Sequence, residues 1–373
     1  MIYFDNSATT LIKPQSVYEN MQKYLFSCAN AGRSSHKPSM KSSQVIFNTR
    51  EKLCELFNFD KPENIIFTYN ATYALNLAIK GLICEKCTVL TSSFEHNSTI
   101  RPLNALSNVN VVIVESTLYN KEEFLGNFKK SITSDTKFAV INHVSNVFGY
   151  ILPIHEIDEI CFNHNIKLIL DISQSAGIID IDISKLKSVV ALCMPSHKGL
   201  YGPLGVGVLI LLENAKESVI QGGTGSLSYS LFQPDFLPDM FETGTPNAPA
   251  IGALYHGVDY VLKNKNISQK LFSLARFTAK KLENIDNTVV FFCDDDNLQS
   301  GVVSFFNTEY DNEYITQKLA DYNICTRAGY HCSPLAHKSA CTDGTIRLSF
   351  SSFNTFFEID KFIEIYKKIL LGY

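Results

Sequence analysis

The chain has 373 residues, more than a single hydrophobic core usually organises, so we expect two domains. Its formal net charge is −4, from 33 Lys and Arg residues and 37 Asp and Glu residues that are scattered along the chain. This balance excludes a strong electrostatic footprint for nucleic acid or for an anionic membrane surface. The first residues lack a secretory pattern and no segment reaches about 18 uninterrupted apolar residues, so we expect a cytoplasmic protein.

Ten cysteines are dispersed through the chain, and without a secretory signal most of them should be reduced and buried. Cys84 and Cys87 form a CxxC pair. No second pair or nearby His completes a zinc set, and no thioredoxin-like context surrounds the pair. A metal or redox role there is therefore the weaker interpretation.

Short apolar, β-branched runs alternate with helix-like stretches over the first two thirds of the chain. In chain order, the expected strands cover residues 65–69, 88–93, 109–116, 137–143, 167–173, 189–194 and 205–212. This alternation predicts an α/β fold with a mainly parallel sheet that is covered on both faces and binds ligands beyond the carboxyl ends of its strands. Polar side chains that follow these runs are therefore the first candidates for a site.

The pattern changes after about residue 255. Expected strands at 289–294, 301–307 and 345–350 are mixed with helical patterns at 314–323 and 356–370. This part of the sequence predicts a smaller α+β domain.

Lys198 directly follows the expected strand at 189–194 and precedes a glycine-rich stretch. A lysine in this position can be partly desolvated, which lowers its pKa and makes its amine available for a Schiff base. Asp171 ends a very apolar run, where a carboxylate is either a helix cap or the partner of a positive group. The pyridine nitrogen of pyridoxal phosphate would be such a partner, and Gln174 could reach the ring hydroxyl from the same turn.

Two further segments follow strands at the same predicted edge. Asn70, Ala71 and Thr72 precede an amphipathic helix, where free N–H groups and a hydroxyl would bind a phosphate. A plain helix cap is an equally good interpretation of that segment. The imidazole of His96 could stack on a cofactor ring and move protons near neutral pH, although a lone His is more often structural.

Cys332 lies in RAGYHCSPLAH, a stretch with little helical or strand periodicity that we expect to be a mobile loop. A thiol near His331 and His337 forms a thiolate more readily than one in a core strand, whereas a free loop cysteine is the simpler interpretation. Arg347 is a forked cation on an otherwise apolar strand, which invites a buried carboxylate such as that of a substrate.

These residues together resemble the class V aminotransferase family of fold-type I pyridoxal-phosphate enzymes, and within it the cysteine desulfurases and selenocysteine lyases. The resemblance implies a large domain at 15–254 with a seven-stranded sheet, and a small domain at 1–14 and 255–373 that carries the cysteine loop. It runs nearly end to end, through the motifs YFDNSATT (3–10), NAGRSSH (30–36), FTYNATYALN (67–76), SSFEHNS (92–98), NHVSNVFG (142–149), LDISQSAG (170–177), SHKGLYGPLGVG (196–207), ETGTPN (242–247), RAGYHCSPLAH (327–337) and GTIRLSFSSFNT (344–355).

For the cofactor ring, the resemblance implies a covalent bond from Lys198 and a contact of Asp171 with the pyridine nitrogen. Gln174 would bind the ring oxygen, and His96 would stack on the ring.

For the anionic groups, the resemblance implies that Thr72 and His197 hold the cofactor phosphate. Thr245 of the neighbouring subunit would help them, so we expect a homodimer with shared sites. Asn146 and Arg347 match the residues that hold the substrate carboxylate.

Cys332 matches the sulfur-accepting cysteine of the family. This implies conversion of L-cysteine to L-alanine with a persulfide on Cys332, whose sulfur passes to an acceptor protein or small thiol for iron–sulfur cluster or thio-cofactor assembly. Selenocysteine lyase acting on L-selenocysteine, transamination, kynureninase-type cleavage and a catalytically silent sulfur-relay scaffold remain as alternatives. The presence of Lys198, Asp171 and Cys332 together argues against the silent scaffold.

The sequence departs from the family pattern at three positions. Pro195 stands where the family often has a hydroxyl that binds the phosphate, and Ser196 could compensate. Asn70 replaces a frequent Gly in the phosphate loop, and Tyr330 replaces a His near the cysteine.

Overall fold

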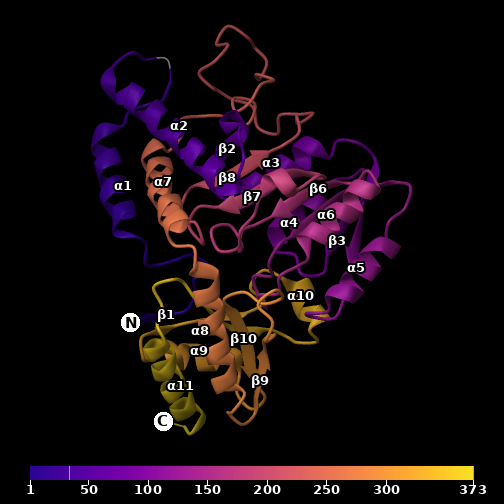
Figure 1. Ribbon diagram of the computed structural model, residues 1–373, viewed down its shortest axis with the longest axis vertical. Helices are drawn as coiled ribbons and strands as arrows, with labels where there is room; N and C mark the ends of the chain where they lie inside the picture. The colour runs from indigo at the N-terminus through magenta and orange to yellow at the C-terminus, as the bar shows by residue number, and fades with distance from the viewer. Residues whose placement is uncertain (33, 373) are drawn as a thin grey trace.

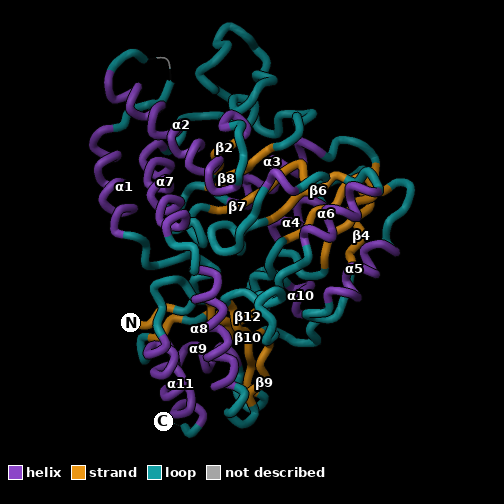
Figure 2. The backbone as a smooth tube through the Cα atoms, in the orientation of Figure 1, coloured by secondary structure: helices purple, strands orange, loops and turns teal. Residues whose placement is uncertain are grey.

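The computed structural model describes residues 1–32 and 34–372; Arg33, which belongs to the 30–36 motif, and Tyr373 lie outside the described residues. Figure 1 shows an upper part built around a large sheet and a lower part that contains a smaller sheet and both chain ends. Figure 2 shows loops running between the two parts.

The large sheet has seven strands in the order β2-β8-β7-β6-β5-β3-β4. Only β8 runs antiparallel to its neighbours, and the other pairs are parallel. This arrangement confirms the predicted α/β class with a mainly parallel sheet. The strands are β2 (Ile65–Thr68), β3 (Cys87–Ser92), β4 (Val109–Val114), β5 (Thr136–Asn142), β6 (Lys167–Asp171), β7 (Val189–Pro195) and β8 (Gly207–Leu211).

Both faces of this sheet are buried, as the continuous apolar runs predict. Successive side chains alternate between two hydrophobic clusters, so that Leu168 and Leu170 belong to one cluster and Ile169 belongs to the other. The helices of the upper part cover these faces. They are α1 (Gln15–Ser27), α2 (Lys37–Phe57), α3 (Ala71–Leu82), α4 (Asn97–Asn104), α5 (Lys121–Lys130), α6 (Ile154–Asn163) and α7 (Ala248–Lys263), with 3₁₀ turns at Pro62–Asn64 and Ile183–Lys185.

The lower part contains a four-stranded antiparallel sheet in the order β12-β13-β10-β9 and a two-stranded parallel pair, β1-β11. A hydrophobic cluster of its own holds it together, and Phe4 from the chain start belongs to that cluster. Its elements are β1 (Ile2–Tyr3), α8 (Ile267–Leu282), β9 (Thr288–Phe291), β10 (Val302–Asn307), α9 (Asn312–Asp321), β11 (Ile324–Cys325), β12 (Arg327–Gly329), α10 (Pro334–Ser339), β13 (Thr345–Ser349) and α11 (Phe356–Leu370).

The helix α7 crosses the predicted domain boundary at residue 254. Leu254 and Val258 pack in the core of the upper part, and Val261 packs in the core of the lower part. The domain bounds of 15–254 and of 1–14 with 255–373 therefore stay a prediction.

Within residues 1–32 and 34–372, no helix is long and apolar enough to cross a membrane.

Candidate active site

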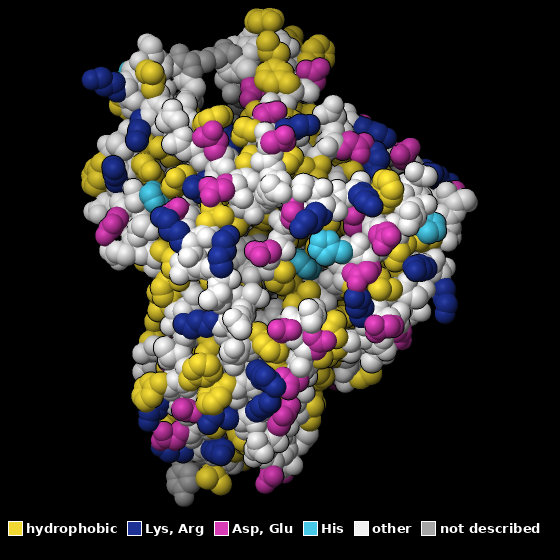
Figure 3. All heavy atoms as spheres, viewed as in Figure 1, with side chains coloured by type: hydrophobic (Ala, Val, Ile, Leu, Met, Phe, Trp, Pro, Cys, Tyr) yellow, Lys and Arg dark blue, Asp and Glu magenta, His cyan; other side chains and the backbone are white. Residues whose placement is uncertain are grey.

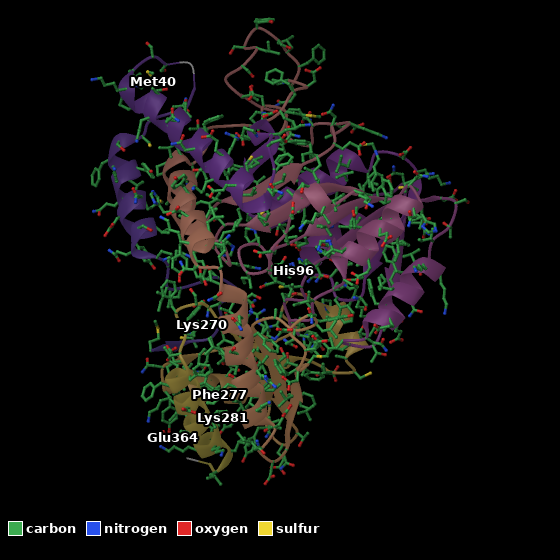
Figure 4. The ribbon with its side chains drawn as sticks, in the orientation of Figure 1. Met40, His96, Lys270, Phe277, Lys281 and Glu364 are labelled. Atoms are coloured by element: carbon green, nitrogen blue, oxygen red, sulfur yellow. The ribbon has the colours of Figure 1, made fainter. Side chains whose placement is uncertain are left out.

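A cavity of about 260 Å³ lies where the carboxyl ends of β3, β5, β6 and β7 meet the lower part of the molecule. Figure 4 places His96 at this junction. The cavity brings together most of the residues singled out in the sequence, namely Asn70, Ala71, Thr72, His96, Asn146, Asp171, Gln174, His197, Lys198, Cys332 and Arg347. Parallel strands explain this, because residues that follow different strands reach one edge of the sheet.

Lys198 lies in the turn after β7, and the N-terminal segment holds that turn from outside. The backbone N–H and the hydroxyl of Thr10 both donate to the carbonyl of His197, at 2.9 and 3.1 Å. Burial lowers the pKa of Lys198 to about 8, although the Asp171 carboxylate opposes that change. Within the described part of the chain the amine has no hydrogen-bond partner, so it is free to react.

Asp171 ends β6 and is buried, with a relative exposure of 5%. Its Oδ1 accepts a hydrogen bond from the backbone N–H of Ser173 at 2.9 Å. Burial raises the pKa of this carboxyl, whereas Ser173 and Lys198 lower it. Gln174 follows in the same turn and donates from Nε2 to the carbonyl of Ser7 at 3.1 Å.

The start of α3 lies at the same edge of the cavity. Asn70 caps this helix, because its side-chain oxygen accepts from the N–H of Tyr73 at 3.0 Å. The cap and the anion site are compatible, since the first turn of a helix has several N–H groups without an intrahelical acceptor. His197 lies beside this cavity, its buried Nδ1 has no partner among the described residues, and burial lowers its pKa to about 4.

His96 caps α4, with its Nδ1 accepting from the N–H of Ser98 at 3.1 Å. This contact places the proton of the neutral ring on Nε2. Burial lowers the pKa of His96 to about 4, and the charges of Lys198 and Arg347 add to the effect. The ring is therefore neutral at pH 7, and its stacking and proton-moving roles stay predictions.

Arg347 lies on β13 with a relative exposure of 2%. Its Nη2 contacts Oδ1 of Asp5 at 2.6 Å, and its Nη1 donates to the carbonyl of Asn146 at 2.9 Å. Arg327 on β12 is its direct cross-strand partner and lines the same cavity. Two opposed arginines repel each other unless an anion lies between them, so this pair favours a carboxylate in the cavity.

Neither Asp5 nor Arg327 was predicted from the sequence as a site residue. The sequence does contain a signal for Arg327, because it begins the RAGYHC stretch, five residues before the cysteine. Asp5 gives no comparable signal, because only the tertiary fold brings it to a residue 342 positions away.

Cys332 is exposed and lies between β12 and α10, while also lining the cavity. The loop is shorter than the sequence predicts, since a short strand precedes the cysteine and a short helix follows it, and its mobility stays a prediction. Both elements have too few residues to show a period in the sequence. The thiol thus faces the same space as Lys198 and Arg347.

Two predicted cofactor-binding residues do not line this cavity. The hydroxyl of Ser196 donates to the carbonyl of Pro203, whereas Pro195 does line the cavity. Thr245 is exposed and lines a second cavity of about 460 Å³, together with Thr68 and Tyr73. That cavity also borders the start of α3. The contacts expected of Ser196 and Thr245 therefore stay predictions.

Cys84 and Cys87 are free thiols. Burial raises the pKa of both. Across residues 1–32 and 34–372 there is no group of three or more His, Cys, Asp or Glu residues that could hold a metal ion.

The family model described as aminotransferase class V matches residues 2–362. The chain belongs to the class V aminotransferase family. Enzymes of this family depend in general on pyridoxal phosphate, and the membership confirms the family resemblance of the sequence.

Curated relatives and solved structures agree with this membership. A probable cysteine desulfurase of Borreliella burgdorferi is 30% identical over 393 residues, which cover 99% of this chain and 92% of the relative. A probable cysteine desulfurase of Pyrococcus abyssi is 29% identical over 389 residues, covering 99% and 94%. The apo structure of cysteine desulfurase from Thermococcus onnurineus NA1 superposes with a TM-score of 0.93 at 28% identity, covering 100% of this chain and 95% of that chain.

Proposed function

We propose that the protein is a pyridoxal-phosphate-dependent cysteine desulfurase that converts L-cysteine to L-alanine and takes the sulfur as a persulfide on Cys332. One observation carries this function: the Cys332 thiol shares a single cavity with the unpartnered amine of Lys198 and the guanidinium of Arg347. A transaminase or a kynureninase-type enzyme would have no use for a thiol at that place.

The residues around the cavity fit the cofactor. Lys198 offers an amine of lowered pKa, and the buried Asp171 carboxylate matches a protonated pyridine nitrogen. The unpartnered Nδ1 of His197 and the start of α3, with Thr72, match a phosphate. When bound, pyridoxal phosphate stores the electron pair left by removal of the α-proton of an amino acid, which makes that proton acidic.

The substrate carboxylate binds between Arg327 and Arg347, where it relieves the repulsion of the two cations. The amide of Asn146 lies beside it. This orients the α-proton toward the amine of Lys198. With a pKa of about 8, this amine is partly neutral near pH 7 and takes the proton.

Cys332 then accepts the sulfur of the substrate. Its thiolate attacks the substrate sulfur, the bond between that sulfur and the substrate Cβ breaks, and the electron pair stays with the carbon. Protons returned to Cβ and Cα give L-alanine, and Cys332 carries the extra sulfur as a persulfide. Because Cys332 is exposed, an acceptor protein or a small thiol can reach this sulfur.

The protein also acts as a homodimer in this proposal. The segment between β8 and α7 projects at the top of Figure 1 and contains three strongly exposed side chains, Tyr229 (87%), Leu231 (99%) and Phe232 (85%). Figure 3 shows hydrophobic side chains gathered on this projection. Such an apolar surface favours a protein partner. A second copy would bring Thr245 near the start of α3, as the shared site requires.

The direct test is release of L-alanine from L-cysteine by protein loaded with pyridoxal phosphate. The proposal expects one alanine for each sulfur delivered to an added thiol, and a parallel assay with L-selenocysteine measures the preference between the two substrates. Protein that binds the cofactor but produces no alanine from L-cysteine would contradict the function.

A further inference from the structure

The backbone at the cysteine is held in an unfavourable conformation. His331 and Cys332 have φ values of 49° and 59°, so two successive residues with side chains occupy the left-handed region. Residues other than Gly rarely adopt this region, and successive ones persist only where surrounding contacts enforce it. Contacts from three other segments meet at this point.

The side-chain amide of Asn146 holds the segment on both sides of Cys332. Its Nδ2 donates to the carbonyl of His331 at 2.8 Å, and its Oδ1 accepts from the hydroxyl of Ser333 at 2.7 Å. Both Asn146 and Ser333 are buried, with relative exposures of 7% and 0%. Hydrogen bonds in such a buried place are stronger than exposed ones and are costly to leave unmade.

Two further contacts hold the backbone of the segment at Cys332. The backbone N–H of Asn97, the first residue of α4, donates to the carbonyl of Cys332 at 2.8 Å. Asn97 directly follows His96, which Figure 4 places at the junction of the two parts. The Nε2 of His331 lies 3.1 Å from the carbonyl of Thr345 on β13. The cysteine is thus tied to α4 of the upper part and to β13 of the lower part.

We propose that Ser333 is a positioning residue for sulfur transfer, which acts through the amide of Asn146 to hold Cys332 in its left-handed conformation beside the cavity. This inference rests on the proposed function, since it assigns a role in that reaction. The amide of Asn146 has a second N–H, which is available to the substrate carboxylate. Asn146 therefore connects the substrate with the cysteine segment, and Ser333 fixes the orientation of that amide.

The test compares Ser333→Ala with the parent and with Ser188→Ala. Ser188 is a matched control, because its buried hydroxyl also bonds a side chain, Oδ1 of Asp158, but it lies before β7 at the opposite edge of the sheet. The first measurement is amide hydrogen exchange, monitored by mass spectrometry. In Ser333→Ala the amide of Asn97 and the segment 328–336 should exchange roughly tenfold faster than in the parent.

The second measurement separates positioning from general damage. With cofactor-loaded protein, Ser333→Ala should form alanine from L-cysteine roughly tenfold more slowly through kcat. Exchange of the α-hydrogen of L-alanine for deuterium needs Lys198 but no thiol, and at saturating L-alanine its rate should stay within about twofold of the parent. Ser188→Ala should match the parent in both reactions.

Three results would overturn the proposal. One is parent-like amide exchange in Ser333→Ala, and another is faster amide exchange with a parent rate of alanine formation. The third is an equal fall of alanine formation and α-hydrogen exchange, which would mean that the whole site is disturbed. If the parent itself forms no alanine, the proposed function fails, while amide exchange still decides whether Ser333 holds the segment.

Discussion

Replacing Asp5 with Asn should destabilise the protein in a way that an added carboxylate reverses. Asp5 supplies the negative charge for Arg347, at 2.6 Å, with side-chain exposures of 19% and 2%. Breaking a fully buried pair costs about 3–5 kcal/mol. Because Asp5 is partly exposed and Asn keeps an acceptor, we expect a loss of about 2 kcal/mol in the free energy of unfolding.

The assay is urea denaturation at pH 7, in sodium chloride and in sodium acetate of equal ionic strength. Acetate should stabilise Asp5→Asn more than the parent, because it can take the place of the lost Asp5 carboxylate beside Arg347. Glu364→Gln is the control, since Glu364 pairs with Lys361 and Lys368 at 3.0 and 2.9 Å on the exposed face of α11. That variant should lose much less stability than Asp5→Asn and show no preference for acetate, because exposed ion pairs contribute little. Equal losses in both variants, or no acetate effect on Asp5→Asn, would refute this reasoning.

Three other changes probe separate parts of the account. Burial lowers the pKa of His337 to about 4, so between pH 6.5 and 4 the unfolded chain binds a proton that the folded protein does not, and acidification through that window destabilises the fold. When the pH falls from 7 to 5, the free energy of unfolding of His337→Phe should therefore decrease by about 2 kcal/mol less than that of the parent. An equal decrease in both proteins would contradict this. Lys198→Ala should fail to retain the yellow cofactor after dialysis, whereas a parent that stays colourless with added pyridoxal phosphate would contradict the cofactor assignment. Leu231→Asp should shift the dimer toward monomer in sedimentation, whereas Phe357→Asp, an exposed apolar position on α11, should not; a parent that is monomeric and active would exclude the shared site.

Much of the fold could be predicted from the sequence, because a buried parallel strand has a continuous apolar run. The expected strand at 65–69 is Ile65–Thr68 in the structure, and that at 205–212 is Gly207–Leu211. The antiparallel direction of β8 could not be predicted, since both of its faces are buried and an apolar run carries no sign of direction. The partial exposure of the edge strand β4 could not be predicted either, because its sequence is mostly apolar although its residues are only partly buried.

The site residues that directly follow strands could be predicted from the sequence. Lys198, Asp171 and His96 were expected at one edge of the sheet, and the structure brings them to one cavity. The contacts that the sequence could not give are those that depend on tertiary packing, such as Asp5 with Arg347. Ser333 is a similar case, because its role depends on a hydrogen bond across 187 residues.

The most direct test of the central claim is the rate of L-alanine formation from L-cysteine in Cys332→Ala. The variant should bind pyridoxal phosphate as the parent does, because Lys198 and Asp171 are unchanged, but it should lose most of this activity, since a methyl group cannot attack sulfur. Cys341→Ala is the matched control, as Cys341 is also an exposed thiol close in sequence, and it should keep the parent rate. If Cys332→Ala forms alanine as fast as the parent, sulfur does not pass through Cys332 and the proposed mechanism is wrong.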